Sequence, residues 1–308
     1  MNSAFECGVL VGLTEAHRRF RDEYGALTRL GAPYTNDEVA WAVIPADHSA
    51  RQRAAEDVRR VLTLVAVDVE MIERRRDGRR FPIRAGIVAR VFDAECSARG
   101  NRVVLFDGYI DPGAHLGWWR DDTLAAFDFK TPVHGIEREQ LIAMRCGGEL
   151  HALANVQLLL RAACAGSSEV DTEALGTTRR PETDAALAAL GGTTCLVGHK
   201  LSADLLALGV CGVGLRRRIV GTAMALAGAD LATGGGKAKV ARRSSASKRA
   251  PSLRALVARF LPEARAAAFQ RGAHAPLEDA EASLDVVCAQ LSRCSADGVG
   301  DGADTVLY

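Results

Sequence analysis

The spacing of apolar and polar residues changes along the chain, and each change predicts a different kind of element. Residues 13–30 carry apolar side chains at helical spacing, and a second, arginine-rich helical stretch follows at 49–61. Either helix could pack against the rest of the chain or lie solvated on its surface. We therefore expect a helical N-terminal extension over residues 1–60.

The next three segments have the composition of β-strands. Residues 62–67 are nearly all apolar, which is typical of a central strand buried on both faces. Two further strands are expected at 82–92 and 102–110, and the polar connectors contain turn sequences such as Asp77-Gly78. Strands joined by such short links form a meander, so this part of the sheet is predicted to be antiparallel.

The second half of the chain alternates predicted helices with short buried strands. Helices are expected at 137–164, 201–208, 252–261 and 277–291, and strands at 195–197 and 218–220. A strand meander followed by alternating helices and strands predicts one α/β domain with a mixed sheet, spanning 61–293. The Gly- and Asp-rich segment 294–308 is expected to be a disordered tail.

Polar and low-complexity segments interrupt this pattern. Residues 234–250 carry six basic side chains and no acidic one, which predicts a flexible loop. This loop could bind nucleic acid, act as a nuclear-import signal or simply be solvated. Residues 166–181 are polar and turn-rich, as in a surface insertion. In another loop, Trp118 and Trp119 could stack on bases or anchor the loop by burying their rings.

Composition narrows the class of protein. Of the 308 residues, 48 % are apolar and 25 % are charged, which is too apolar for a wholly disordered chain. No stretch approaches the roughly 18 uninterrupted apolar residues of a membrane span, and residues 4–13 fit a secretory signal poorly because Glu6 lies among them. The eight cysteines form no Cys-x-x-Cys pair, which favours reduced thiols in a cytosolic or nuclear protein. The net charge of +1 does not by itself suggest a nucleic-acid ligand.

An acidic pair follows the first predicted strand. In Asp68-Val69-Glu70, residues two apart on a strand point to the same side, with about 6–7 Å between them. At that spacing both carboxylates can reach one pair of hard cations, which prefer oxygen ligands. The alternative interpretation is an acidic pair that merely ends the strand.

Two later segments offer further ligands and a base. Asp204 is expected in the first turn of a helix after the strand at 195–197, where His199 could be structural or catalytic. Asp279 is expected on the last helix, which Pro276 would open, while His274 stays on the loop before it. A histidine there is suited to accept a proton from water near neutral pH. Taken singly, these segments also fit ordinary polar residues at helix starts.

The four carboxylates carry more information together than singly. If Asp68, Glu70, Asp204 and Asp279 converge on one site, they repel each other strongly unless cations are present. The combination therefore predicts metals. Two Mg²⁺ or Mn²⁺ ions about 4 Å apart are the apparatus of phosphodiester cleavage.

These motifs, in this order, resemble those of the DEDDh 3′–5′ exonucleases of the DnaQ-like, ribonuclease-H-like superfamily, and most closely the eukaryotic Rex-type RNA exonucleases. The likeness runs from about residue 62 to 291. The matching segments are Asp68-Val69-Glu70-Met71, Asp128-Phe129-Lys130-Thr131 with Val133-His134-Gly135-Ile136, Gly198-His199-Lys200-Leu201 with Asp204, and His274 with Glu278-Asp279-Ala280.

The resemblance implies a ribonuclease-H-like mixed sheet flanked by helices and a metal-dependent exonuclease. Its substrate would be the 3′ end of single-stranded RNA, and its products nucleoside 5′-monophosphates. The four carboxylates match the family's ligands for two Mg²⁺ or Mn²⁺ ions, and His274 matches its general base. A deoxyribonuclease with the same residues, and a non-catalytic RNA-binding protein on the same fold, are the alternatives.

Substrate contacts and location are further expectations. Met71 and Leu201 lie beside motif residues and could wedge against terminal bases, while cations could bind phosphates. The cations considered for this role are Lys130, Arg242 and Arg243. The family has an Asp where this chain has Gly221; that Asp is not a metal ligand, so the change concerns packing. With the basic loop, the resemblance implies an intracellular, nuclear or nucleolar, location.

Overall fold

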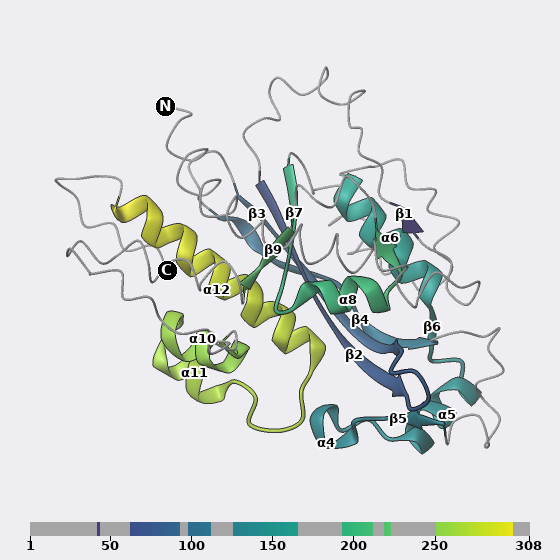
Figure 1. Ribbon diagram of the computed structural model, residues 1–308. Helices are drawn as coiled ribbons and strands as arrows, with labels where there is room; N and C mark the ends of the chain where they lie inside the picture. The colour runs from purple at the N-terminus through teal and green to yellow at the C-terminus, as the bar shows by residue number, and fades with distance from the viewer. Residues whose placement is uncertain are drawn as a thin grey trace, which may run out of the picture.

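The structure of the protein is a computed structural model. It describes residues 42–43, 62–92, 98–111, 126–165, 193–211, 219–222 and 251–297 (Figure 1). The predicted helices at 13–30 and 49–61, the tryptophan pair and the basic loop at 234–250 lie outside these residues. Within 1–60, Ala42–Val43 form a short strand, β1, rather than part of a helix. In the part of the chain described, no helix is long and apolar enough to cross a membrane.

Three long strands form the antiparallel half of the sheet. Strand β2 (Leu62–Arg74) pairs antiparallel with β3 (Arg80–Phe92), and β3 pairs antiparallel with β4 (Ala98–Asp111). The predicted meander is confirmed, although each strand is longer than its apolar segment. Pairing continues into polar positions because backbone hydrogen bonds, and not side chains, make the ladder.

Shorter parallel strands extend the sheet on the other side of β2. Strand β7 (Thr193–Gly198) pairs parallel with β2, and β9 (Ile219–Gly221) pairs parallel with β7. On the far edge of the sheet, β6 (His151–Ala152) pairs parallel with β4. The short strand β5 (Phe127–Asp128) pairs antiparallel with the end of the central strand β2. The order β6-β4-β3-β2-β7-β9 is the expected ribonuclease-H-like mixed sheet, an antiparallel meander followed by parallel strands. Separately, β1 pairs parallel with β8 (Val210–Cys211).

Seven helices are described around this sheet. They are α4 (Thr131–His134), α5 (Arg138–Cys146), α6 (Leu153–Ala165), α8 (Leu201–Ala207), α10 (Leu253–Phe260), α11 (Glu263–Ala268) and α12 (Pro276–Asp297). The short helices α4 and α11 were not predicted, and the helical segments expected within 137–164 are α5 and α6, with β6 between them. The prediction of a disordered tail from residue 294 was wrong for residues 294–297, which continue α12 and its backbone hydrogen-bond ladder.

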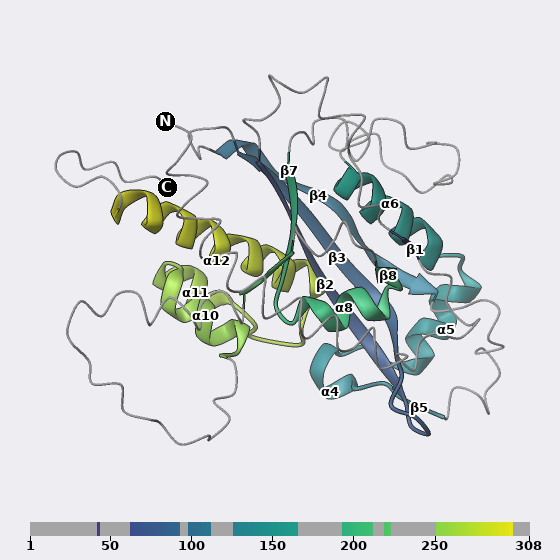
Figure 2. The same ribbon diagram turned by 45° about the horizontal axis from the view of Figure 1, so that its top comes forward.

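The apolar run of β2 is explained by helices on both faces. Val65 and Val67 lie in one core cluster with residues of α6 and α8, while Leu64 and Ala66 lie in another with residues of α12. Figure 2 shows α12 along one side of the long strands and α6 along the other. Burial on both faces makes β2 the centre of the fold, and its polar continuation beyond Val67 is therefore held rigidly.

Candidate active site

The first two carboxylates lie inside β2, at the point where the strand continues past its parallel neighbour. The last register pair between β2 and β7 is Ala66 with Val197, whereas β2 runs on to Arg74. The prediction that β2 ends at the acidic pair was therefore wrong, because the strand that ends there is β7. Asp68 and Glu70 lie beside the carboxyl end of a parallel strand, which is where α/β sheets bind ligands.

A glycine on the neighbouring strand lets α12 begin next to Asp68. Gly86 is the register partner of Asp68, and a Cβ atom on Gly86 would lie 2.3 Å from the backbone nitrogen of Leu277. Only glycine allows the first turn of α12 to rest this closely on the strand. As predicted, Pro276 opens the helix, and Asp279 lies in its first turn.

Asp204 reaches the site from α8, on the other side of β2. The helix begins after Lys200, whose φ of 61° turns the chain sharply out of β7, and Asp204 lies in its first turn as predicted. The carboxylate is buried, and its Oδ2 atom has no hydrogen-bond partner within the described part of the chain. A buried carboxylate oxygen without a partner is costly unless a cation binds it.

The structure brings all four carboxylates together, and their pKa values reflect it. Burial raises the pKa of Asp68 well above its usual range, and the charges of Asp204, Asp279 and Glu70 raise it further. Burial and the charge of Asp279 raise the pKa of Glu70 to about 7, against the opposing effect of Arg84.

The remaining two carboxyl groups behave alike. The pKa of Asp204 is raised by burial and then by the Glu70 charge, and that of Asp279 chiefly by burial. Without a cation, keeping these groups ionised therefore lowers the stability of the folded protein.

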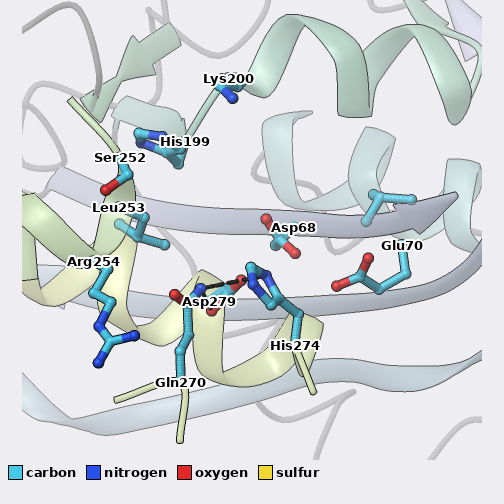
Figure 3. Close-up of a pocket in the computed structure, with 11 residues that line it drawn as sticks. Asp68, Glu70, His199, Lys200, Ser252, Leu253, Arg254, Gln270, His274 and Asp279 are labelled. Carbon is cyan, nitrogen blue, oxygen red and sulfur yellow. Dashed lines mark hydrogen bonds and ion pairs between the residues drawn. The ribbon is translucent and has the colours of Figure 1, made fainter. Parts of the chain in front are cut away.

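His274 lies on the loop before α12 and faces Asp279. Its Nδ1 atom is 3.1 Å from Oδ2 of Asp279, and its side chain is 39 % exposed (Figure 3). The backbone N–H of His274 donates to the carbonyl oxygen of Val133, which ties this loop to α4. The segment 128–136, matched in the resemblance, therefore supports the loop that carries His274.

The residues present fit hard divalent cations. Glu70, His274 and Asp279 each offer a ligand atom, and these atoms lie within 4.8 Å of one another. Asp68 and the unpartnered oxygen of Asp204 add further carboxylate donors to the same site. Carboxylate oxygens in this number are the ligands that Mg²⁺ and Mn²⁺ prefer.

The pocket in front of these carboxylates has a positively charged side. The residues that line it are Asp68, Val69, Glu70, His199, Lys200, Ser252, Leu253, Arg254, Gln270, His274 and Asp279. Lys200 and Arg254 are exposed, and among the described residues neither forms an ion pair. In Figure 3 Lys200 and Arg254 lie on the same side of the pocket as His199 and Ser252, away from Glu70.

His199 has a structural role here. Its Nδ1 atom lies 3.1 Å from the hydroxyl of the fully buried Thr222, and burial lowers its pKa to about 4. Neutral and hydrogen-bonded, it ties the end of β7 to the end of β9, next to Gly221. Thr222, which follows Gly221, therefore takes part in the packing between these two strands.

The residues predicted to contact substrate lie in different environments. Leu201 is fully buried in the core cluster of α6 and α8, so the prediction that it wedges against bases was wrong. Met71 is half-buried and packs against that same core. Lys130 is exposed and pairs with Asp128 at 2.5 Å, and it does not line the pocket. Arg242 and Arg243 lie outside the described residues.

Sequence reasoning missed several residues that line the pocket. Gln270, Ser252 and Arg254 had no motif to mark them, since each comes from a segment that only the fold brings to the site. Lys200 belongs to the segment Gly198-His199-Lys200-Leu201, but the sequence gives no sign that its side chain is exposed at the pocket.

Comparisons with known proteins give a likeness of fold only. No family profile and no curated protein matches the chain. Among solved structures it is similar to the Pan2 catalytic unit of Neurospora crassa, a protease and nuclease domain, at 18 % identity and a TM-score of 0.42, over 77 % of this chain and 28 % of that one.

A second similar structure is the pseudoubiquitin hydrolase–RNA exonuclease module of Saccharomyces cerevisiae Pan2, in complex with AACCAA RNA. Its identity is also 18 %, with a TM-score of 0.42 over 79 % of this chain and 33 % of that one. The chain thus spans a third or less of the length of these proteins. We base the function on the side chains of the site and not on this likeness.

Proposed function

We propose that the protein is a metal-dependent 3′–5′ exoribonuclease that hydrolyses single-stranded RNA to nucleoside 5′-monophosphates. One observation carries the proposal: four carboxylates from β2, α8 and α12 lie close together, and three of them line one pocket with His274. Mutual repulsion at such a site is costly to the fold, and a role in binding divalent cations accounts for it. The direction of hydrolysis and the preference for RNA follow from the resemblance of the motifs.

Asp68, Glu70, Asp204 and Asp279 are the residues that would hold two Mg²⁺ or Mn²⁺ ions. Such ions activate water and stabilise the leaving oxygen in phosphodiester hydrolysis. The chain contributes the fixed geometry, since the two helices that carry Asp204 and Asp279 pack against opposite faces of the strand that carries Asp68 and Glu70.

His274 would act as the general base. Its Nδ1 atom faces Asp279, which leaves Nε2 to accept a proton from the attacking water. Partial exposure lets the ring reach a substrate in the pocket, while its backbone hydrogen bond to Val133 holds the loop in place. Asp279 would then both bind metal and orient the base.

The exposed cations on one side of the pocket suit a polyanion. Lys200 and Arg254 can neutralise phosphates of the strand that leads into the site. The basic loop at 234–250, with Arg242 and Arg243, remains a predicted contributor to the same binding.

The first test uses single-stranded RNA labelled at either its 3′ or its 5′ end, with the purified protein in Mg²⁺ or Mn²⁺. We expect stepwise release of 5′-monophosphates from the 3′ end, abolished by EDTA and by Asp68→Ala. The control variant Glu139→Ala removes an exposed carboxylate of α5 and should leave activity unchanged. Activity that survives both EDTA and Asp68→Ala would contradict the proposal.

The same assay separates the alternatives. Competition between RNA and DNA of one sequence distinguishes an exoribonuclease from a deoxyribonuclease, because only RNA offers 2′-hydroxyl contacts. Binding of RNA without any turnover would instead indicate a non-catalytic RNA-binding protein.

A further inference from the structure

Gln270 has an unusual backbone conformation at the edge of the pocket. Its φ is 51°, in the left-handed region that side chains other than glycine and asparagine seldom adopt. The residue before it, Phe269, is buried in a core cluster with residues of α10 and α12. Packing of Phe269 thus fixes the chain on one side and forces Gln270 to turn toward the site. Strain of this kind is held at functional positions when the surroundings over-determine it.

The side chain of Gln270 is directed at one carboxylate. Its Nε2 atom donates to both oxygens of Asp279, at 2.9 and 3.0 Å. The two oxygens of one carboxylate lie too close together to take one N–H each from the same amide nitrogen, so a single N–H of Gln270 is shared between them. Because Asp279 is only 4 % exposed, these bonds replace water that the carboxylate would otherwise bind.

His274 shares this carboxylate with Gln270. Nδ1 of His274 lies 3.1 Å from Oδ2 of Asp279 and 3.4 Å from Nε2 of Gln270. An ionised carboxylate can only accept hydrogen bonds, so the Nδ1–H of His274 is the donor in the contact with Asp279. The three side chains therefore form one connected set with Asp279 at its centre (Figure 3).

We propose that Gln270 is a positioning residue that holds the Asp279 carboxylate ready for a divalent cation and keeps His274 bonded to it. This inference rests on the proposed function. Gln270 binds no substrate in this role; it fixes the direction of a ligand and, through that ligand, of the base. Partners of this kind beside a metal ligand commonly change metal affinity or activity by about 10- to 100-fold when they are removed.

Two variants of the full-length chain test the proposal. Gln270→Gly adopts the same φ without strain but lacks the amide, so it separates the side chain from the backbone. Gln270→Glu keeps the size but replaces the donor by a charge that faces Asp279. The matched control for that charge is Gln140→Glu, because Gln140 is exposed on α5 and its amide donates to the hydroxyl of Tyr109.

The main readout is Mn²⁺ binding without RNA, measured by titration calorimetry, with thermal unfolding in EDTA at pH 8 beside it. We expect Gln270→Gly to weaken Mn²⁺ binding about tenfold. Gln270→Glu is expected to unfold in EDTA about 3 °C or more below Gln140→Glu, since two carboxylates then face each other without a cation.

Two results would overturn the proposal. One is an unchanged Mn²⁺ affinity in a folded Gln270→Gly protein. The other is equal unfolding temperatures for the two glutamate variants, which tests the inference even if the glycine variant does not fold. The wild-type protein separates this inference from the proposed function. If it binds no Mn²⁺ and cleaves no RNA, the proposed function fails; if it does both and the variants match it, only the role of Gln270 fails.

Discussion

The two sides of the pocket are built by different means. On one side Asp68 and Glu70 are fixed by the register of β2 with β3, in which Asp68 pairs with Gly86 and Glu70 with Arg84. On the other side the side chains of His274 and Asp279 are held by hydrogen bonds to each other and to Gln270. We call these the strand side and the loop side.

The difference predicts which substitutions change activity alone and which also change stability. On the strand side a carboxylate can be removed while the backbone ladder stays intact, so its loss should affect activity without harming the fold. On the loop side the residues hold each other, so a change in support should alter position, stability and activity together. The following predictions test this distinction, from the largest expected effect to the smallest.

Asp68→Asn tests the strand side and should have the largest effect on activity. We expect RNA hydrolysis in Mn²⁺ to fall by about 10³-fold or more, since a metal ligand contributes several kcal/mol to transition-state stabilisation. In EDTA at pH 8 the melting temperature should rise, because one of four mutually repelling carboxylates is gone. A lower melting temperature in EDTA would show that Asp68 supports the strand, which would remove the distinction.

Gly86→Ala tests the contact between the two sides. The added Cβ would lie 2.3–2.5 Å from backbone atoms of Pro276 and Leu277, so the start of α12 must move and carry Asp279 with it. We expect the free energy of unfolding to fall by about 1–3 kcal/mol and hydrolysis to fall as well. Denaturant unfolding and the RNA assay measure both. In the control Gly272→Ala, nothing lies within 4 Å of the added atom, so neither quantity should fall.

The pH dependence of stability tests whether the carboxylates repel each other. The pKa of Glu70 is raised from 4.5 to about 7, so the folded protein keeps this proton to a higher pH than the unfolded chain. In EDTA the free energy of unfolding should therefore decrease as the pH rises through this window and then level off. Bound Mn²⁺ favours the ionised groups, so the gain in melting temperature from Mn²⁺ over EDTA should widen from about pH 5 to pH 8.

The variant Glu70→Gln is the control for this pH effect. It lacks the titrating group, so its stability in EDTA should depend less steeply on pH over the same window. A wild-type protein whose stability in EDTA rises with pH over this window would contradict the interpretation.

Gly135→Ala tests the support of the loop side and should have the smallest effect. Gly135 has a φ of 71°, and an added Cβ would lie 2.9 Å from Cβ of Ala273, next to His274. The control Gly78→Ala has nearly the same φ, 69°, and open space around it. Both variants should lose about 1–2 kcal/mol of stability to backbone strain. Only Gly135→Ala should also slow hydrolysis, and equal rates for the two would show that this contact does not position His274.

The elements of the fold could be predicted where burial imposes a pattern. Residues 63–67 are buried, and the segment 62–67 was predicted as a strand, as were 82–92 and 102–110. Helix α4 was missed because it has only four residues with Pro132 among them, and α11 because its six residues bury no side chain. The continuation of β2 past Val67 was missed because the acidic pair has the composition of a strand end, although the ladder with β3 continues there.

The candidate site was predictable to the extent that its residues carry chemistry of their own. Carboxylates beside buried strands and a histidine before a helix are visible in the chain, and the structure brings them close together, with all but Asp204 lining one pocket. Leu201 was misjudged because its neighbours in sequence lie at the pocket while its own side chain points into the core. Gln270 could not have been found, since a glutamine in a polar segment has no pattern.

By itself, the sequence determined the antiparallel meander, the apolar core of β2 and the set of acidic residues available for a metal site. Those features are local: they depend on hydropathy and residue type along short segments. Only the tertiary structure decided that β7 stops while β2 continues, that α12 rests on Gly86, and that Gln270 reaches Asp279. These features depend on close contact between segments far apart in the chain, and packing in three dimensions sets such contacts.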